Sequence, residues 1–263
     1  MKKPFNWKIY IILLAASIVG VVAAIPYSLA VQGTTLSELN VPMPTWLLLL
    51  LQILQSAIMF AVIILLGLLA ANRIGIGLPV LEAKLQGEAI GQRIRSFLLL
   101  SIVIGIVGSV LIVLLDRLVF MPRLMAELGE KAATLNQEAL RPAAWKGLLV
   151  SFYGGINEEL LLRLGLMSIL VWLGRFVSKT ADGRPTLAVL WSANILAAVL
   201  FGLGHLPATA ALFSLTPLVI LRAITLNGLL GIAFGYLYFK HGLEAAILSH
   251  FTADIVLHVL LAL

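Results

Sequence analysis

The sequence predicts an all-α fold: a polytopic bundle of about seven transmembrane helices, or eight, around a polar intramembrane cavity. Hydrophobic residues make up 61% of the 263 positions, and charged residues make up only 11%. A soluble domain needs roughly a quarter of its residues charged, so the composition excludes a soluble enzyme. The absence of cysteine excludes a disulfide scaffold and a Cys-based zinc site. Apolar runs also recur along the chain, each long enough to cross a hydrocarbon layer about 30 Å thick.

The predicted spans follow these apolar runs in chain order. They cover residues 9–31, 45–70, about 97–120, about 147–173, 187–206, about 217–239 and 242–263. The first run follows a basic start, and we expect a retained helix because the run is long for a signal peptide. The stretch from Leu206 to Phe239 is too long for one span. Pro207 and Pro217 therefore predict a short interfacial or re-entrant piece between them.

The distribution of basic residues predicts the orientation. Lys and Arg resist translocation and collect in cytoplasmic loops. With the N-terminus inside, eleven of them lie on the cytoplasmic side and four on the other, all four within residues 121–146. That segment also contains acidic residues and is predicted to be an amphipathic surface segment. We expect a multi-pass protein of the cell (inner) membrane that contacts lipid and binds no nucleic acid, although its net charge is +6.

One integral membrane domain in two parts is expected. Residues 1–145 supply N-terminal transmembrane helices and the amphipathic segment, and residues 146–263 supply the core helices that carry three polar motifs. Ionisable groups inside apolar helices cost roughly 2.5–3.5 kcal/mol each on insertion scales, and they usually face the interior of a bundle. Each motif is therefore a functional hypothesis.

The first motif, in the fourth predicted span, contains two adjacent acids. Glu159 and Arg163 are four residues apart, so they share a helical face and can form an ion pair. Glu158 points about 100° away from Glu159. Pairing leaves Glu158 without an obvious helical partner, and this makes it a candidate general base. Glu159 and Arg163 are predicted to be supporting residues.

The second and third motifs each place a histidine one helical turn from a partner. Phe201 can form a wall beside His205, and Asp254 can orient His250 and stabilise its charge. Other ionisable residues are interpreted as structural: His241, His258, Glu244 and the Asp116–Arg117 pair. Arg222, in the sixth predicted span, is given no specific role.

The three motifs stand in a fixed order, each on its own span. They are Glu158-Glu159-x-x-x-Arg163, Phe201-x-x-x-His205 and His250-x-x-x-Asp254. In this order they resemble the CAAX-protease and bacteriocin-processing (abortive-infection) family of intramembrane endopeptidases, which includes the type II CAAX prenyl endopeptidases. The resemblance covers about residues 150–263. It implies a helical membrane bundle and hydrolysis of a peptide bond.

The resemblance also implies a role for each motif residue. Glu158 would activate a water with help from His205, His250 and Asp254 would stabilise the oxyanion, and Arg163 would hold the acidic pair. An ionised Asp254 cannot donate a hydrogen bond to an oxyanion, so it would orient His250 or be protonated itself. The substrate would be a membrane-associated protein or peptide, with lipid modification as one option.

Three alternatives stay open on the sequence. Two histidines and a carboxylate are also a zinc-hydrolase pattern, so a zinc-dependent metalloprotease could use the same residues. The resemblance instead implies a glutamate-based mechanism without a cofactor. Buried Glu, His and Asp could also form the relay of a proton-coupled carrier, although no internal repeat favours one. The third alternative is a catalytically silent membrane scaffold.

Overall fold

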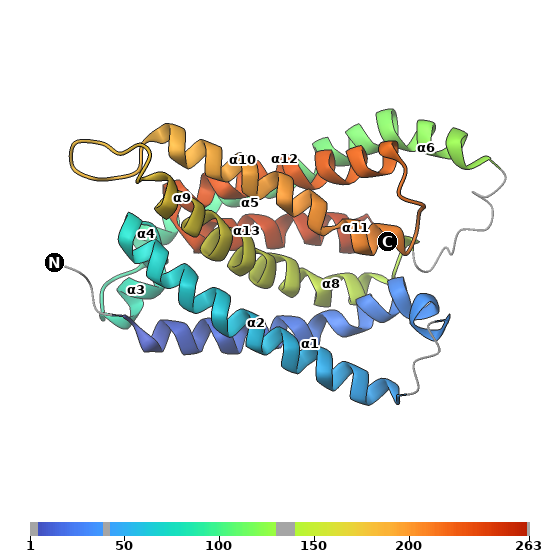
Figure 1. Cartoon of the computed structure of the whole chain (residues 1–263), viewed down its shortest axis with the longest axis horizontal. Coiled ribbons are helices and arrows are strands. Elements are labelled where there is room, and N and C mark those ends of the chain that lie inside the picture. The colour runs from blue at the N-terminus through green and yellow to red at the C-terminus, as the bar shows by residue number, and fades with distance from the viewer. Residues whose placement is uncertain (1–4, 39–42, 130–139, 262–263) are drawn as a thin grey trace.

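The computed structural model describes residues 5–38, 43–129 and 140–261. In these ranges the chain is a bundle of helices whose long axes run side by side (Figure 1), and this confirms the predicted all-α class. An isolated β-bridge joins Lys179 to Pro185 in the turn that follows α9.

The first half of the chain supplies seven described helical segments, where η denotes a π-helix. They are α1 (Trp7–Glu38), α2 (Thr45–Ile74), α3 (Pro79–Leu85), α4 (Gly91–Arg95), α5 (Leu98–Leu115), η1 (Asp116–Phe120) and α6 (Met121–Leu128). The second half supplies the elements that carry the three motifs. They are α8 (Ala144–Phe152), η3 (Tyr153–Glu158), η4 (Leu160–Met167), α9 (Ser168–Gly174), α10 (Leu187–Gly204), α11 (Leu206–Ala210), α12 (Pro217–His241), α13 (Leu243–Asp254) and η5 (Ile255–Leu260).

Six helical segments among the described residues are long and apolar enough to cross a membrane. They are Trp7–Val31, Thr45–Ile74, Gly91–Leu128, Leu187–Ala210, Pro217–His241 and Leu243–Leu260. Each coincides with a predicted span. The fourth predicted span, residues 147–173, lies within the helical run from α8 to α9 but is not among the six, because the charged residues of the first motif fall at its middle.

Helix ends follow local sequence signals. The hydroxyls of Thr186 and Thr216 accept hydrogen bonds from the backbone N–H groups three residues later, and so cap α10 and α12. Pro217 occupies the first turn of α12, where its missing N–H is not needed. The predicted short piece after Pro207 is the five-residue helix α11, which is followed by a turn into α12.

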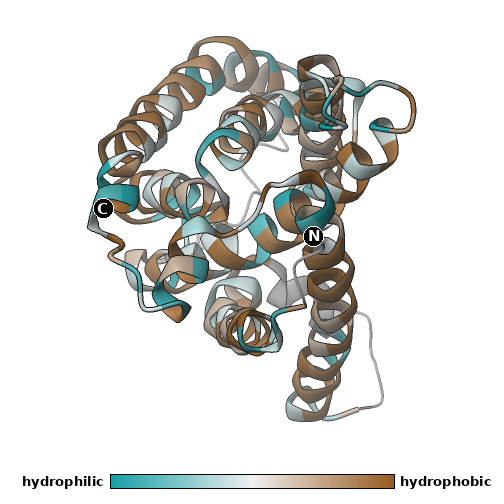
Figure 2. Ribbon diagram, turned by 90° about the vertical axis from the view of Figure 1, so that its left-hand side faces the viewer, coloured by the Kyte–Doolittle hydropathy of each residue, from teal (hydrophilic) through white to brown (hydrophobic). Residues whose placement is uncertain are grey.

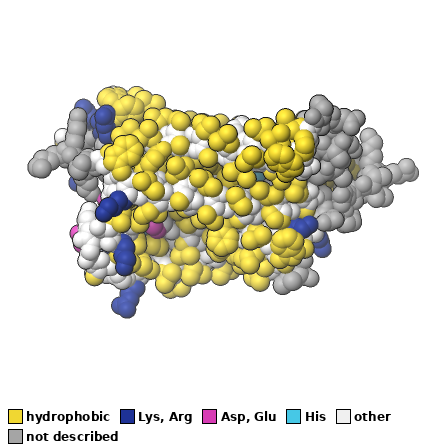
Figure 3. Space-filling view, turned by 90° about the horizontal axis from the view of Figure 1, so that it is seen from below, with side chains coloured by type: hydrophobic (Ala, Val, Ile, Leu, Met, Phe, Trp, Pro, Cys, Tyr) yellow, Lys and Arg dark blue, Asp and Glu magenta, His cyan; other side chains and the backbone are white. Residues whose placement is uncertain are grey.

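Apolar side chains cover the outside of the bundle. On α2, Leu50, Leu54 and Ile58 are each more than half exposed, as expected of a surface that faces lipid tails. Figure 3 shows one such apolar face, with Lys and Arg side chains towards its two ends. Figure 2, viewed from the end where α1 begins, shows hydrophobic residues along most of the helices. The outer surface of the bundle is therefore suited to contact with lipid.

Helix α13 lies inside the bundle and contacts α5, α12 and η3. Close approach to α5 requires glycine at position 105, because a Cβ there would come within 2.6 Å of the backbone oxygen of Ser249. The start of α13 is fixed as well. Glu244 Oε1 accepts hydrogen bonds from the backbone N–H groups of Val80 (3.0 Å) and Leu81 (2.9 Å). Glu244 thus has a structural contact, which ties α13 to α3.

The opposite end of the bundle has a small hydrophobic cluster of its own. Leu124 of α6 packs with Phe213 and Val219, and the neighbouring Arg123 and Glu127 are exposed. The predicted amphipathic segment, residues 121–146, thus has an apolar and a polar face along α6, and residues 130–139 lie outside the described part of the chain.

Arg222, which had no assigned role, binds Asp116. Its Nε and Nη2 atoms each lie 2.7 Å from a carboxylate oxygen, a two-pronged ion pair that joins η1 to α12. The sequence paired Asp116 with its neighbour Arg117, but the contact that forms is with a residue 106 positions away. The pair has a structural role, because it links two helices.

Candidate active site

The first motif forms a fully buried ion pair. Arg163 Nε lies 3.3 Å from Glu159 Oε2, and neither side chain is more than 1% exposed. Arg163 Nη2 also donates to the backbone oxygen of Gly231 on α12, at 3.1 Å. The pair lies where two π-helical stretches meet, since η3 ends at Glu158 and η4 begins at Leu160. Such stretches are rare and frequently occur at functional sites.

His250 on α13 is the centre of the cluster. Its Nδ1 lies 2.8 Å from Glu159 Oε1, and its Nε2 lies 3.5 Å from Glu158 Oε2 and 3.7 Å from Asp254 Oδ1. A carboxylate accepts hydrogen bonds, so the Nδ1–H of the ring donates to Glu159. The other nitrogen then faces Glu158 and Asp254. The contact with Glu159 was missed by sequence reasoning, which paired this acid with Arg163 alone.

Two phenylalanine rings shield this cluster. The Phe234 ring stacks on His250 with centroids 4.5 Å apart, and Phe201 meets His250 edge-on at 5.7 Å. The guanidinium carbon of Arg163 lies 5.4 Å from the Phe201 ring and 5.8 Å from the Phe234 ring. The two rings lower the local dielectric constant and so strengthen the ionic contacts of the cluster. Phe234 was not predicted, because an apolar residue in an apolar span carries no distinguishing signal.

His205 lies at the end of α10 beside the same phenylalanine. The rings of Phe201 and His205 meet edge-on at 4.7 Å, and Nδ1 of His205 lies 2.9 Å from the backbone oxygen of Phe201. Because that oxygen can only accept, the Nδ1–H donates, and Nε2 keeps its lone pair. Within the described residues, no hydrogen bond joins His205 to Glu158 or His250. The structure thus connects His205 to the cluster through the Phe201 ring.

Gly154 leaves space beside the acids. A Cβ at this position would overlap Asp254 Oδ2 and would come 3.3 Å from His250 Nε2. Asp254 is buried, whereas the Glu158 side chain is 21% exposed. Glu158 is therefore the more accessible of the acids around His250. This cluster of buried ionisable groups occupies the part of the bundle where the sequence predicted a polar cavity.

The acids do not form a preformed metal site. Among the described residues, no three His, Asp or Glu side chains are grouped so that they could hold a metal ion. Glu158 and Asp254 touch His250 directly, at 3.5–3.7 Å, and do not surround a common centre. His250 Nδ1, the other possible ligand atom of the ring, is occupied by Glu159.

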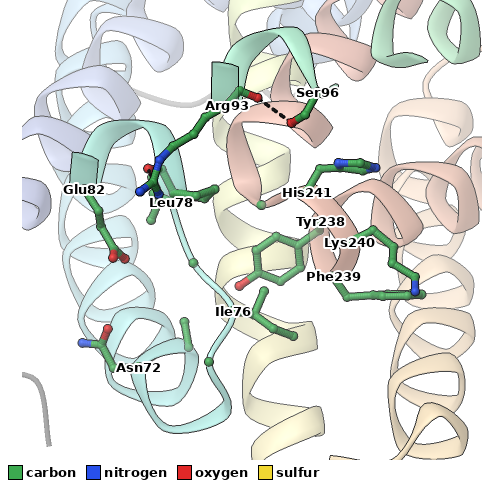
Figure 4. Close-up of a pocket in the computed structure, with 15 residues that line it drawn as sticks. Asn72, Ile76, Leu78, Glu82, Arg93, Ser96, Tyr238, Phe239, Lys240 and His241 are labelled. Carbon is green, nitrogen blue, oxygen red and sulfur yellow. Dashed lines mark hydrogen bonds between the residues drawn. The ribbon is translucent and has the colours of Figure 1, made fainter. Parts of the chain in front are cut away.

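A pocket of about 410 Å³ opens elsewhere, between the ends of α2, α12 and the α3–α4 region (Figure 4). None of the predicted site residues lines it. Its wall includes Tyr238, whose hydroxyl lies 2.6 Å from Ser168 Oγ. Ser168 in turn donates to the backbone oxygen of Arg163 at 3.1 Å. The pocket is thus separate from the cluster but linked to it by hydrogen bonds.

Comparison with known proteins gives a match over the part of the chain that carries the three motifs. A family model, described as type II CAAX prenyl endopeptidase Rce1-like, matches residues 140–256. No curated protein and no solved structure shows a significant match. The matched range contains all three motifs and every residue of the predicted site, and it confirms the predicted resemblance. Over residues 140–256 the chain is therefore similar to the Rce1-like family of type II CAAX prenyl endopeptidases, a family of membrane proteases.

Proposed function

We propose that the protein is an intramembrane endopeptidase in which Glu158 activates the water that attacks a peptide bond. The observation that carries this proposal is the contact of the Glu158 carboxylate with His250 Nε2, at 3.5 Å inside the bundle. The adjacent Glu159 is fully buried, with one oxygen facing His250 and the other facing Arg163. Glu158 alone of the pair is accessible and so can meet water and substrate.

These positions support the following reaction. Glu158 takes a proton from water, and the water oxygen bonds to the carbonyl carbon of the substrate. The Nε2 of His205 accepts a hydrogen bond from the same water. Protonated His250 donates from Nε2 to the oxyanion of the tetrahedral intermediate, and such a donor contributes roughly 3–4 kcal/mol. Glu158 then passes its proton to the leaving nitrogen as the C–N bond breaks, which restores the carboxylate.

The remaining residues support His250. Glu159 faces its Nδ1 and stabilises the protonated ring, and Arg163 compensates the charge of Glu159 in a region that water does not reach. Asp254 faces Nε2 at 3.7 Å. A carboxylate cannot donate to an oxyanion, so Asp254 acts by orienting His250.

The chemistry proposed needs no cofactor, and the substrate is a membrane-associated peptide or protein. The family description makes a prenylated C-terminal CAAX peptide the first probe, with the same peptide without its lipid as the second. Both probes would carry a fluorophore and a quencher on opposite sides of the expected cleavage site. Turnover would be measured with the purified protein in lipid vesicles.

Glu158→Gln should lower turnover at least 1000-fold and leave the melting temperature unchanged, because Gln fits the same space but cannot take a proton. Glu88→Gln is the matched control, since Glu88 is exposed and pairs with Arg93. Turnover that survives Glu158→Gln would overturn the proposal. Turnover that a chelator removes and zinc restores would instead favour the metalloprotease alternative.

A further inference from the structure

A third histidine extends the cluster beyond the three motifs. His258 lies four residues after Asp254, and its Nε2 lies 4.0 Å from Asp254 Oδ1. Its Nδ1 lies 3.3 Å from the hydroxyl of Tyr27, and the two rings meet edge-on at 5.5 Å. The ionisable groups thus continue from His250 through Asp254 and His258 to Tyr27. His258 and Tyr27 both lie outside the matched range of residues 140–256.

The protein backbone holds His258 in this position. η5, which carries His258, packs against α8. The approach is so close that a Cβ on Gly147 would overlap the backbone oxygen of His258. Tyr27 comes from α1, which also packs on α8 and η3. Three elements distant in sequence (α1, α8 and η5) therefore meet at His258.

The contacts suggest one arrangement of protons. The Tyr27 hydroxyl can donate to Nδ1 of His258, and the neutral ring then carries its proton on Nε2. That N–H faces the Asp254 carboxylate. Asp254 is buried and His258 is about one-third exposed, so the imidazole is the more accessible member of this contact. His250 and His258 thus both face Oδ1 of Asp254, from one helical turn before it and one helical turn after it.

We propose that Tyr27 and His258 are positioning residues that hold Asp254 against His250. Neither touches the reacting atoms, and both act through Asp254. As a contribution to catalysis, this inference rests on the proposed peptidase function. The arrangement of protons itself can be measured without turnover.

The first experiment uses the same turnover assay. Tyr27→Phe keeps the ring and removes the hydroxyl, and His258→Leu removes the imidazole that faces Asp254. We expect His258→Leu to lower kcat about 10-fold and Tyr27→Phe about 3-fold, with KM changed less than 2-fold. His258→Gln, which keeps an N–H donor, should recover part of the loss. Because Tyr27 acts through His258, adding Tyr27→Phe to His258→Leu should cause no further loss.

Tyr10→Phe is the matched control. Tyr10 also lies on α1, and its hydroxyl donates to the backbone oxygen of Ala61 at 3.3 Å, away from the cluster. It should leave kcat unchanged. Wild-type kcat in both Tyr27→Phe and His258→Leu, or a full multiplicative loss in the double variant, would overturn the inference. A loss confined to KM would do the same.

The second experiment separates this inference from the proposed function. The chain has four histidines, so selective ¹⁵N labelling of histidine gives four imidazoles to assign by NMR. We expect His258 to carry its proton on Nε2, and Tyr27→Phe to move its Nδ1 resonance without affecting His241. A His258 ring protonated on Nδ1, or resonances unchanged by Tyr27→Phe, would overturn the inference even if Glu158→Gln had abolished turnover. Turnover retained by Glu158→Gln, with the expected resonances, would remove the peptidase proposal and leave the arrangement of protons around His258 standing.

Discussion

The carboxylate of Glu159 lies 2.8 Å from Nδ1 of His250 and joins the acidic motif to α13 across 91 positions of sequence. The same carboxylate faces Arg163 with its other oxygen. Glu159 is therefore an acid committed to structure, next to an acid that is left accessible. The two neighbours have opposite tasks because their surroundings differ.

Replacing Glu159 should destabilise the protein. Glu159→Gln leaves the guanidinium of Arg163 buried without its counter-charge, and breaking a buried pair in this way costs about 3–5 kcal/mol. We expect a lower melting temperature in detergent as well as slower turnover. Glu158→Gln should change only turnover. Equal melting temperatures for the two variants would contradict the division of tasks between these acids.

Gly154 should tolerate no side chain. A methyl group there would overlap Asp254 Oδ2, so Gly154→Ala should displace the acid and lower turnover at least 10-fold. Overpacking of this kind also lowers the free energy of unfolding by roughly 1–3 kcal/mol. Gly91→Ala is the control, because a Cβ on Gly91 meets nothing within 4 Å. Normal activity in Gly154→Ala would mean that the space beside Asp254 is not needed.

The ion pair between Asp116 and Arg222 should behave as a link between helices. Arg222→Met leaves Asp116 unpaired in a partly buried position and should lower the melting temperature. Exchanging both residues, Asp116→Arg with Arg222→Asp, should recover part of that loss because the pair can form again. The coupling is measured by comparing the melting temperatures of Asp116→Arg, of Arg222→Asp and of the protein that carries both changes. Additive losses would show that the contact contributes nothing.

The orientation of the bundle can be tested with single cysteines, since the chain contains none. We propose that the N-terminus is cytoplasmic, as the bias of basic residues supports. Asp182→Cys should then be protected from a membrane-impermeant maleimide in intact cells, whereas Ser214→Cys should react. Both positions are exposed in the structure. The reverse labelling pattern would mean that the opposite orientation is adopted.

Much of the architecture could be predicted because burial in lipid leaves a simple signal in the chain. The apolar runs predicted the six segments that can cross a membrane, and the Pro207–Pro217 interval predicted the break around α11. Periodicity of four residues was enough to pair Glu159 with Arg163. These features depend on local sequence, which is why they could be found without coordinates.

The contacts between distant elements could not be predicted. Neither the partnership of Glu159 with His250 nor the stacking of Phe234 leaves a local pattern. The π-helical turns around the acidic motif also change the spacing of side chains, which a regular helical period does not describe. Tyr27 and His258 are 231 positions apart, so only the fold brings them together.

Helix α13 is attached at its first residues, because the Leu243 N–H donates to the backbone oxygen of Gly77 and Glu244 accepts from α3, so a tilt of the helix would turn about that end. At about 1.5 Å of rise per residue, His250 lies roughly 10 Å from it and His258 roughly 22 Å. Any swing of the helix about this hinge point moves His258 about twice as far as His250. The contact of Tyr27 with His258 therefore acts far from the attached end, where even a weak contact limits the tilt of the helix.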